Sequence, residues 1–308
     1  MGNIDGHGEG WRFVRAMAVA VVLFAAADVG FGVVAERVFM GLPLRDNMAS
    51  TVLWRSRGGA DVVLIGSSRC HHHYVAAQLR DSLSRWLGEE VTVYNYGLDG
   101  VYVNSSLCAL ECMLQEYRPR MVILDANSHE FGKEYTNTVA SSSPLYRSNE
   151  VVRRYINEAD WRNRVKMLSG FYRFRNAMPV RMAQVLMSEG DSLMGYIPVE
   201  GVMDEEVEYP AGPTLEEFEA DESVAENFRR VARLAKEKGV RMVVVDSPRW
   251  RPKDNSEYVR RLCEECGVEF LDWYSTEYFN ERPELFFEPA HLNGDGAREF
   301  TEKLRIEN

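Results

Sequence analysis

Residues 61–74 read DVVLIGSSRCHHHY, and the prediction of the fold starts from this stretch. Four apolar residues, 62–65, lead directly into Gly66 and Ser67, a pattern typical of a buried strand that ends in a tight turn. In an open parallel sheet, the ligand crevice lies at the carboxyl ends of the strands. A hydroxyl group that follows such a strand is held at the mouth of that crevice, so Ser68 is the candidate nucleophile.

The alternation of strand and helix continues along the chain, with one long interruption. Apolar segments rich in β-branched residues predict strands, and amphipathic segments between them predict helices that cover the sheet. The predicted strands are residues 62–65, 91–94, 121–124, 240–245 and 268–273, and the predicted helices are 74–87, 107–117, 215–239, 256–266 and a last helix that reaches residue 306. Together they predict an α/β domain over residues 61–308 with a central parallel five-stranded sheet.

Residues 133–214 form the interruption, because they contain no new apolar strand. Helical-looking segments at 151–168 and 171–187 predict a helical insertion that covers the catalytic face. Its aromatic residues are candidates for sugar stacking or for a lid, with most of them expected in the core. They are Tyr146, Tyr155, Trp161, Phe171, Tyr172 and Phe174.

The N-terminal part of the chain is apolar over about twenty residues, the length that a bilayer requires. We predict a disordered N-terminus at 1–11, an uncleaved transmembrane anchor at 12–36 and a connector at 37–60. Asp28 weakens this prediction, because it places a carboxylate within the apolar run. A cleaved signal peptide and a hydrophobic helix docked on the domain are the alternatives.

The basic residues that flank the span do not fix its orientation. Arg12 and Arg15 precede it, and Arg37 and Arg45 follow it, so the positive charges are nearly balanced. We expect the catalytic part to lie outside the cytoplasm, in the periplasm.

The composition is that of a globular protein and limits the partners. A hydrophobic share of 45% and a charged share of 27% are ordinary, and a net charge of −11 argues against nucleic acid as a partner. The five cysteines favour free thiols, and a disulfide between Cys263 and Cys266 is the alternative for an exported domain. Residues 66–69 lack the lysine and the spaced glycines of nucleotide-binding turns, so no cofactor is predicted.

Ester chemistry at a serine needs a base, a group that orients the base, and donors for the oxyanion. Ser68 follows the first strand, Gly97 the second and Asn127 the third, while His291 lies in the loop after the last strand. All four are expected at the same crevice. Glu288 lies three residues before His291 and could accept a hydrogen bond from its Nδ1.

These residues give the chain a resemblance to the SGNH (GDSL-like) hydrolase superfamily, in particular to its membrane-anchored bacterial branches. The resemblance covers about residues 62–127 and 241–304. Residues 66–68 stand at the Gly-Asp-Ser block, Gly97 at the second-block glycine, 125–128 at the Gly-x-Asn-Asp block and 288–291 at the Asp-x-x-His block. The family implies a three-layer flavodoxin-like fold and a catalytic pair of Ser68 and His291. It also implies an oxyanion hole made by the amides of Ser68 and Gly97 and by the side chain of Asn127.

Four residues depart from the pattern of that family. Ser67 replaces an aspartate, Asp125 a glycine, Ser128 an aspartate, and Glu288 is one methylene longer than the usual acid. The longer acid can still reach the imidazole, but its alignment is less certain. A catalytically inactive member of the family therefore stays open as an alternative.

Each candidate residue also has a purely structural explanation. Ser68 could cap the following helix, His291 could be a loop histidine, and Asn127 could be a turn residue. The run at 71–73 suggests a metal, but successive helical side chains point about 100° apart, so three cannot share one ion without help. We predict no metal site. Asp99, Asp246 and His129 also follow strands, and we assign them no chemistry.

The sequence thus predicts a membrane-tethered serine esterase or O-acyltransferase. Its expected substrate is an acylated carbohydrate of the cell surface, preferably O-acetylated, and its expected catalytic residues are Ser68, His291 and Glu288. The alternatives are a catalytically inactive glycan-binding or assembly protein and a cytoplasmic lipase-like enzyme whose N-terminal helix is docked on the domain.

Overall fold

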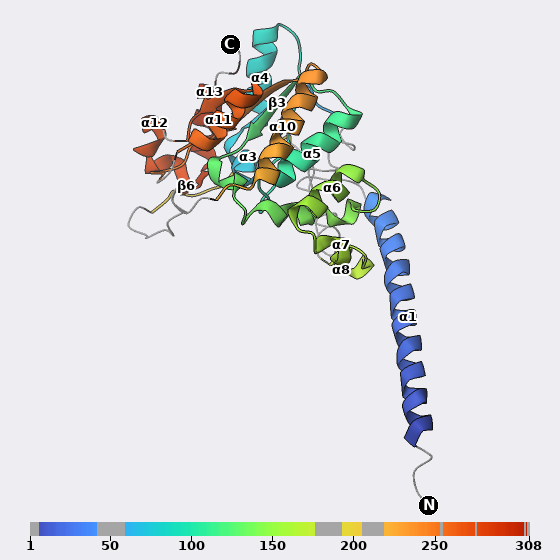
Figure 1. Cartoon of the computed structure of the whole chain (residues 1–308). Helices are drawn as coiled ribbons and strands as arrows, with labels where there is room; N and C mark the ends of the chain where they lie inside the picture. The colour runs from blue at the N-terminus through green and yellow to red at the C-terminus, as the bar shows by residue number, and fades with distance from the viewer. Residues whose placement is uncertain are drawn as a thin grey trace, which may run out of the picture.

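The computed structural model describes residues 6–41, 59–175, 193–204, 219–252, 255–274, 276–304 and 306. It contains a five-stranded sheet whose strands are all parallel, in the order β2-β1-β3-β4-β5 (Figure 1). The strands are β1 Val62–Ile65, β2 Val93–Asn95, β3 Met121–Asp125, β4 Arg241–Asp246 and β5 Glu269–Asp272. The predicted α/β fold with a five-stranded parallel sheet is confirmed.

The sheet is covered on both faces, and β1 shows why the sequence of each strand is a nearly continuous apolar run. Val63 and Ile65 belong to the hydrophobic cluster on one face, and Val62 and Leu64 to the cluster on the other. Alternate side chains of a strand point to opposite faces, so a strand buried on both faces needs an apolar residue at every position. The register pairs Ile65 with Leu124 of β3, which brings the two carboxyl ends to the same edge of the sheet.

Two groups of helices cover the faces. The first cluster takes side chains from α5, α10 and α11, and the second takes them from α4 and α13. The bounds are α3 Ser68–His73, α4 Ala76–Leu87, α5 Val103–Glu116, α10 Glu222–Glu237, α11 Glu257–Cys266 and α13 Gly294–Lys303. All five cysteines are free thiols, as the sequence favoured, and Cys263 and Cys266 form no disulfide.

The insertion predicted at 133–214 is helical in the described part before residue 176, and its described residues 193–204 form no helix. Its helices are η2 Thr136–Leu145, α6 Glu150–Ala159, α7 Asn163–Lys166 and α8 Gly170–Phe174, and the short η1 Ser128–Phe131 precedes it. The single helix predicted at 151–168 is wrong, because the Asp160 carboxylate accepts from the backbone N–H of Arg162 and closes a turn there. Residues 176–192 and 205–218 lie outside the described residues, and with them most of the helix predicted at 171–187.

Other element boundaries also differ from the prediction: α10 begins at Glu222 and ends at Glu237, and the last helix ends at Lys303 and not at residue 306. The helix expected at 74–87 begins two residues later, at Ala76, because Tyr74 and Val75 are extended, and a separate short helix, α3, precedes it at Ser68–His73. The segment expected to lead directly into the last helix contains α12 Glu277–Asn280, η4 Pro283–Leu285 and an antiparallel hairpin of β6 Phe286–Glu288 and β7 His291–Leu292. Strands of two or three residues are too short to produce an alternating pattern that could be recognised.

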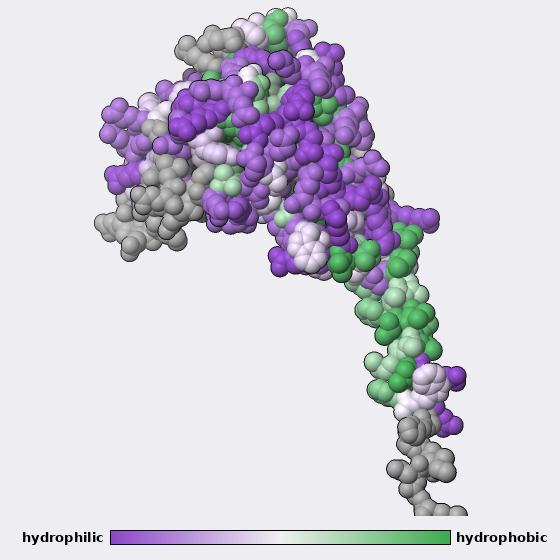
Figure 2. Space-filling view, viewed as in Figure 1, coloured by the Kyte–Doolittle hydropathy of each residue, from purple (hydrophilic) through white to green (hydrophobic). Residues whose placement is uncertain are grey.

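The N-terminal segment forms one helix, α1 Gly6–Gly41, that extends away from the domain (Figure 1). Its segment Gly10–Val38 is long and apolar enough to cross a membrane. Figure 2 shows hydrophobic residues along its length, whereas hydrophilic residues dominate the same view of the domain. The prediction of disorder is wrong for 6–11, because a helix once nucleated extends at low cost into polar sequence. Residues 37–41 of the predicted connector are helical, and 42–58 lie outside the described residues.

Asp28 joins α1 to the insertion. Its carboxylate accepts hydrogen bonds from Ser169 Oγ at 2.8 Å and from the backbone amides of Gly170 at 2.9 Å and Phe171 at 2.8 Å. The ring of Phe171 stacks on Phe31 of α1, with 4.5 Å between centroids. Asp28 therefore caps α8, so the acidic residue that interrupts the apolar run has a structural partner on the domain.

The tight turn after β1 should not accept a larger residue than Gly66. A Cβ at this position would lie 2.7 Å from Cys70 Cβ and 2.9 Å from the backbone oxygen of Asp125. We expect Gly66→Ala to lower the free energy of unfolding by about 1–3 kcal/mol, the usual cost of overpacking. Gly294→Ala is the control, because its Cβ would meet nothing nearer than 3.6 Å. Equal thermal midpoints for the two full-length variants in detergent would contradict the expectation.

Candidate active site

Ser68 lies at the carboxyl end of β1, where the sequence places it, and is the first residue of α3. Its backbone N–H belongs to the first turn of the helix, where no helical carbonyl can accept it. The turn is fixed from the side of β2, because Leu98 N donates to the backbone oxygen of Gly66 at 3.2 Å. The hydroxyl that follows β1 therefore has a defined position at the edge of the sheet.

His291 and Glu288 complete a hydrogen-bonded chain with Ser68. His291 Nε2 lies 2.7 Å from Ser68 Oγ, and His291 Nδ1 is hydrogen bonded to Glu288 Oε1. A carboxylate only accepts, so Nδ1 carries the proton and Nε2 presents a lone pair to the Ser68 hydroxyl. The hairpin of β6 and β7 sets this geometry, because Glu288 and His291 are cross-strand partners in it.

Glu288 is held in its ionised form. The Ala290 backbone N–H donates to its other oxygen, Oε2, at 3.2 Å. Burial opposes ionisation, but the hydrogen bonds from His291 and Ala290, together with the positive charge of Arg249, outweigh it and lower the pKa of Glu288. An ionised acid at this position stabilises the charge that His291 gains when it takes a proton.

His73 fixes the hairpin to α3. The backbone N–H of Leu292 donates to His73 Nε2 at 3.0 Å, so this nitrogen has a lone pair. His73 Nδ1 therefore carries the proton and donates to Ser247 Oγ at 2.8 Å. Burial lowers the pKa of His73 well below its ordinary value, in agreement with a neutral ring. His73 is thus a structural residue that holds β7, and with it His291, against the helix of Ser68.

The two other candidate oxyanion donors have partners inside the protein. The Gly97 amide donates to Asn95 Oδ1 at 2.9 Å. Asn127 accepts from the amide of Glu130 at 3.1 Å through Oδ1 and donates to Glu130 Oε1 at 3.4 Å through Nδ2. An oxyanion role for Gly97 or Asn127 would require these hydrogen bonds to be exchanged.

Behind Ser68 lies a buried ion-pair cluster that the sequence did not predict. Arg69 is 4% exposed, and its Nη2 donates to Asp125 Oδ1 at 3.2 Å and to Asp246 Oδ1 at 2.7 Å. The hydroxyl of Tyr74 donates to Asp125 Oδ2 at 2.5 Å. The guanidinium carbon of Arg69 lies 5.3 Å from the centre of the Tyr274 ring. Arg69, the residue after Ser68, is therefore held at the carboxyl ends of β3 and β4.

Glu130 extends this cluster toward Asn127. Its Oε1 accepts from Ser67 Oγ at 3.0 Å, and its Oε2 has no hydrogen-bond partner among the described residues. Burial raises the pKa of Glu130 to about 8 and that of Asp246 to about 7. One buried arginine thus faces three carboxyl groups, and two of them bind protons more tightly than ordinary acids do.

The three consecutive histidines take different directions. His71 Nδ1 lies 2.8 Å and His72 Nε2 3.2 Å from the same oxygen of Asp99, whereas His73 turns to Ser247. His72 is also the neighbour of the catalytic candidate, with 5.6 Å between its ring centroid and that of His291. Asp99 and Asp246, to which the sequence gave no chemistry, are therefore both partners of side chains on α3.

The structure thus brings Ser68, His291 and Glu288 together, with Asn127 bonded to the neighbouring Glu130. Sequence reasoning missed Arg69, Glu130 and the partners of Asp99 and Asp246. A charged residue directly after a buried strand and turn was the one signal that could have indicated Arg69. No protein-family model matches this chain, and a search of curated proteins finds no match. The chemistry proposed below therefore rests on the residues of the site.

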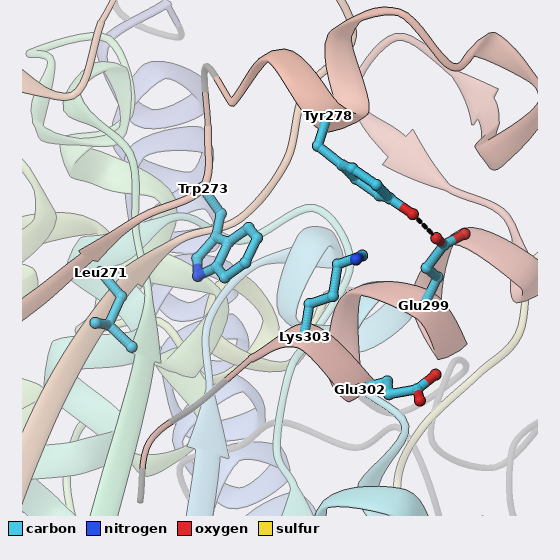
Figure 3. Close-up of a pocket in the computed structure, with 6 residues that line it drawn as sticks. All are labelled: Leu271, Trp273, Tyr278, Glu299, Glu302 and Lys303. Atoms are coloured by element: carbon cyan, nitrogen blue, oxygen red, sulfur yellow. Dashed lines mark hydrogen bonds between the residues drawn. The ribbon is translucent and has the colours of Figure 1, made fainter. Parts of the chain in front are cut away.

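A separate pocket lies between β5, α12 and α13 (Figure 3). Trp273 and Leu271 form its apolar side, and Tyr278 donates to Glu299 across it. Lys303 Nζ lies 4.0 Å from the centre of the Tyr278 ring. None of the predicted catalytic residues lines this pocket.

The raised pKa of Glu130 predicts a pH-dependent stability. Between the ordinary pKa of an acid and about 8, the native state binds more protons than the unfolded chain, so stability falls as pH rises. Glu130→Gln removes this contribution and keeps an oxygen for Ser67. We expect the variant to match wild type near pH 5 and to gain stability relative to it toward pH 9, by at most about 1.4 kcal/mol per pH unit.

Denaturant unfolding of the full chain in detergent at several pH values measures this difference. Glu302→Gln, a change of an exposed acid on α13, is the control and should keep the wild-type profile. A difference between Glu130→Gln and wild type that does not change with pH would contradict a raised pKa.

Proposed function

We propose that this chain is a membrane-anchored serine esterase or O-acyltransferase of the SGNH type. The observation that carries the proposal is the hydrogen-bonded chain from Ser68 Oγ through His291 to Glu288. A serine, a histidine and an ionised acid in this order are the parts of a general-base-activated nucleophile.

The first half of the proposed reaction forms an acyl-serine. Ser68 Oγ attacks the carbonyl carbon of the ester while His291 Nε2 takes the hydroxyl proton. Glu288 stabilises the imidazolium and keeps Nδ1 protonated. The bond from the carbonyl carbon to the alcohol oxygen then breaks, and His291 returns its proton to the leaving alcohol.

The second half repeats these steps with a new acceptor. His291 takes a proton from water or from a sugar hydroxyl, whose oxygen attacks the acyl carbon and releases Ser68. Water gives an esterase and a sugar hydroxyl gives a transferase, and both use the same acyl-Ser68 intermediate. The amide of Ser68, at the first turn of α3, is the donor best placed for the oxyanion.

The fold supports the assignment to the SGNH type. The strand order β2-β1-β3-β4-β5 is that of flavodoxin-like sheets, whose ligands bind at the carboxyl ends of the strands. Ser68 and Asn127 both follow such ends, those of β1 and β3. The three-layer flavodoxin-like fold and the family remain part of the proposal.

The proposed substrate is an O-acyl group, preferably O-acetyl, on a cell-surface glycan. This choice rests on the resemblance to membrane-anchored branches of the family. The aromatic residues of the insertion add little to it, because Tyr155 and Phe174 are buried in the core and Phe171 packs on α1. Trp161, 71% exposed, remains a candidate for contact with a sugar or with lipid.

A non-catalytic glycan-binding or assembly protein is the second candidate. The observation that favours it is that Gly97 and Asn127 already have internal hydrogen-bond partners. A protein that kept the crevice but not the oxyanion donors would bind an ester without cleaving it. Reactivity of Ser68 toward a fluorophosphonate separates the two candidates.

We further propose that α1 anchors the protein in a membrane with the domain in the periplasm. Apolar side chains that precede α8 in the sequence remain exposed on the insertion, as expected for a surface that lies against lipid. They are Trp161, Val165 and Leu168, between 65% and 71% exposed. Because Asp28 is bound to α8 and the ring of Phe24 lies 6.1 Å from that of Phe171, the part of α1 before Phe24 is the part free to enter the bilayer.

Loss of the catalytic pair should abolish turnover. We expect Ser68→Ala and His291→Ala to lower the release of acetate from p-nitrophenyl acetate and from an acetylated polysaccharide by at least about 10³-fold. Glu288→Gln should lower it by about 10²-fold or more, because Nδ1 loses its anionic partner.

Ser148→Ala, at a distant turn, is the matched control and should keep wild-type activity. A fluorophosphonate should label wild type but not Ser68→Ala. Equal inactivity of all variants and wild type, together with no labelling, would favour the non-catalytic candidate.

Membrane association should depend on the free part of α1. We expect the full chain to stay in the membrane pellet after a carbonate wash, and a variant with Val21→Arg, Val22→Arg and Leu23→Arg to leave it. Each arginine costs about 2.5–3.5 kcal/mol at the centre of a spanning helix. Asp28→Ala is the control. This substitution makes the helix more apolar, so the variant should stay in the membrane pellet. Release of wild type by carbonate would instead indicate a helix docked on a soluble domain.

A further inference from the structure

The ring nitrogens of His71 and His72 converge on one carboxylate beside the catalytic candidate. His71 Nδ1, His72 Nε2 and an oxygen of Asp99 all lie within 4.8 Å of one another. The two histidine side chains are 3% and 11% exposed, whereas that of Asp99 is 59% exposed. The cluster therefore has a buried side formed by imidazoles and an open side toward solvent.

The hydrogen bonds of His72 define which of its nitrogens is available. Its Nδ1 lies 2.8 Å from the backbone oxygen of Ile197, and a carbonyl oxygen only accepts. Nδ1 must therefore carry a proton, and in the neutral ring Nε2 has a lone pair. That lone pair faces Asp99 Oδ1 at 3.2 Å, so two acceptors point at each other unless a positive species lies between them.

The species can be a proton, which makes His72 an imidazolium, or a metal ion. The hydrogen bond from His72 Nδ1 to Ile197 is typical of a metal ligand, because ligating histidines usually donate their other ring N–H to a carbonyl or carboxylate. Two imidazole nitrogens and one carboxylate oxygen are a donor set that suits Zn²⁺, and an exposed carboxylate leaves room for water or a substrate oxygen.

We propose that His71 Nδ1, His72 Nε2 and Asp99 form a binding site for a divalent transition-metal ion, with Zn²⁺ as the best-fitting ion. The sequence gave no metal site to this run because three consecutive side chains diverge. The structure explains the difference, since His73 does turn away and Asp99 supplies the third ligand from the loop after β2. The site involves none of Ser68, His291 and Glu288, so it can exist whether or not the proposed reaction does.

Metal binding by the full chain in detergent tests this site. At pH 8, isothermal titration should find one Zn²⁺ per chain, and Co²⁺ should give visible d–d absorption without the thiolate charge-transfer band that cysteine ligands would produce. We expect His72→Ala and Asp99→Asn each to weaken Zn²⁺ affinity by at least about 10-fold. His129→Gln and Asp81→Asn are matched controls outside the cluster and should bind like wild type, and circular dichroism verifies that all variants are folded.

Two outcomes would overturn the proposal. If wild type binds no stoichiometric metal, His72 is an imidazolium that pairs with Asp99. If His72→Ala and Asp99→Asn bind Zn²⁺ as tightly as wild type, the metal lies elsewhere on the chain. Neither result contradicts the proposed function, because that function is tested separately by fluorophosphonate labelling of Ser68, which does not require this metal site.

Discussion

The buried charge of Arg69 is the constraint on which the site depends. A guanidinium that is 4% exposed must be matched by anions, and Asp125 and Asp246 supply them from the ends of two neighbouring strands. Removing one partner of such a pair commonly costs 3–5 kcal/mol, because the other charge stays buried. Since α3 has only six residues and is too short to be stable alone, this ion pair holds it, and therefore Ser68, in place.

The short helix then distributes its side chains over four contacts. Ser68 is hydrogen bonded to His291, and Arg69 pairs with the buried aspartates. His71 and His72 both lie within hydrogen-bond distance of Asp99. His73 is hydrogen bonded to Ser247 and to the hairpin of β6 and β7. Successive helical residues are rotated by about 100°, so Ser68, Arg69 and His73 reach different partners, whereas the stacked rings of His71 and His72 share Asp99. The density of polar residues in this stretch therefore reflects four separate partners and not one shared ligand.

The sequence predicts the sheet because strands buried on both faces must be apolar at every position. It also predicts the position of Ser68, because Ser68 follows β1 at the edge where the ends of the parallel strands meet. His291 lies instead in the antiparallel hairpin of β6 and β7, which the sequence did not predict. The polar partners could not be found in this way. Asp246 is 177 residues from Arg69, and Asp28 is more than 140 residues from the amides that it binds. Contacts between residues so far apart produce no local pattern in the sequence. From the sequence alone, Asp28 therefore looks like an interruption of the apolar run, although in the structure it caps α8.

The four departures from the family pattern also have physical partners. Ser67 donates to Glu130, Asp125 accepts from Arg69 and Tyr74, Ser128 donates to the backbone oxygen of Asn255, and Glu288 bonds His291. A buried polar residue without a partner would cost several kcal/mol, and each of these four residues avoids that cost through its hydrogen bonds. Asp125 needs the buried arginine, and Ser67 needs an acceptor such as Glu130. Ser67 Oγ and Asn127 Nδ2 both donate to Oε1 of Glu130, so the charge of this one carboxyl group affects the strength of both hydrogen bonds.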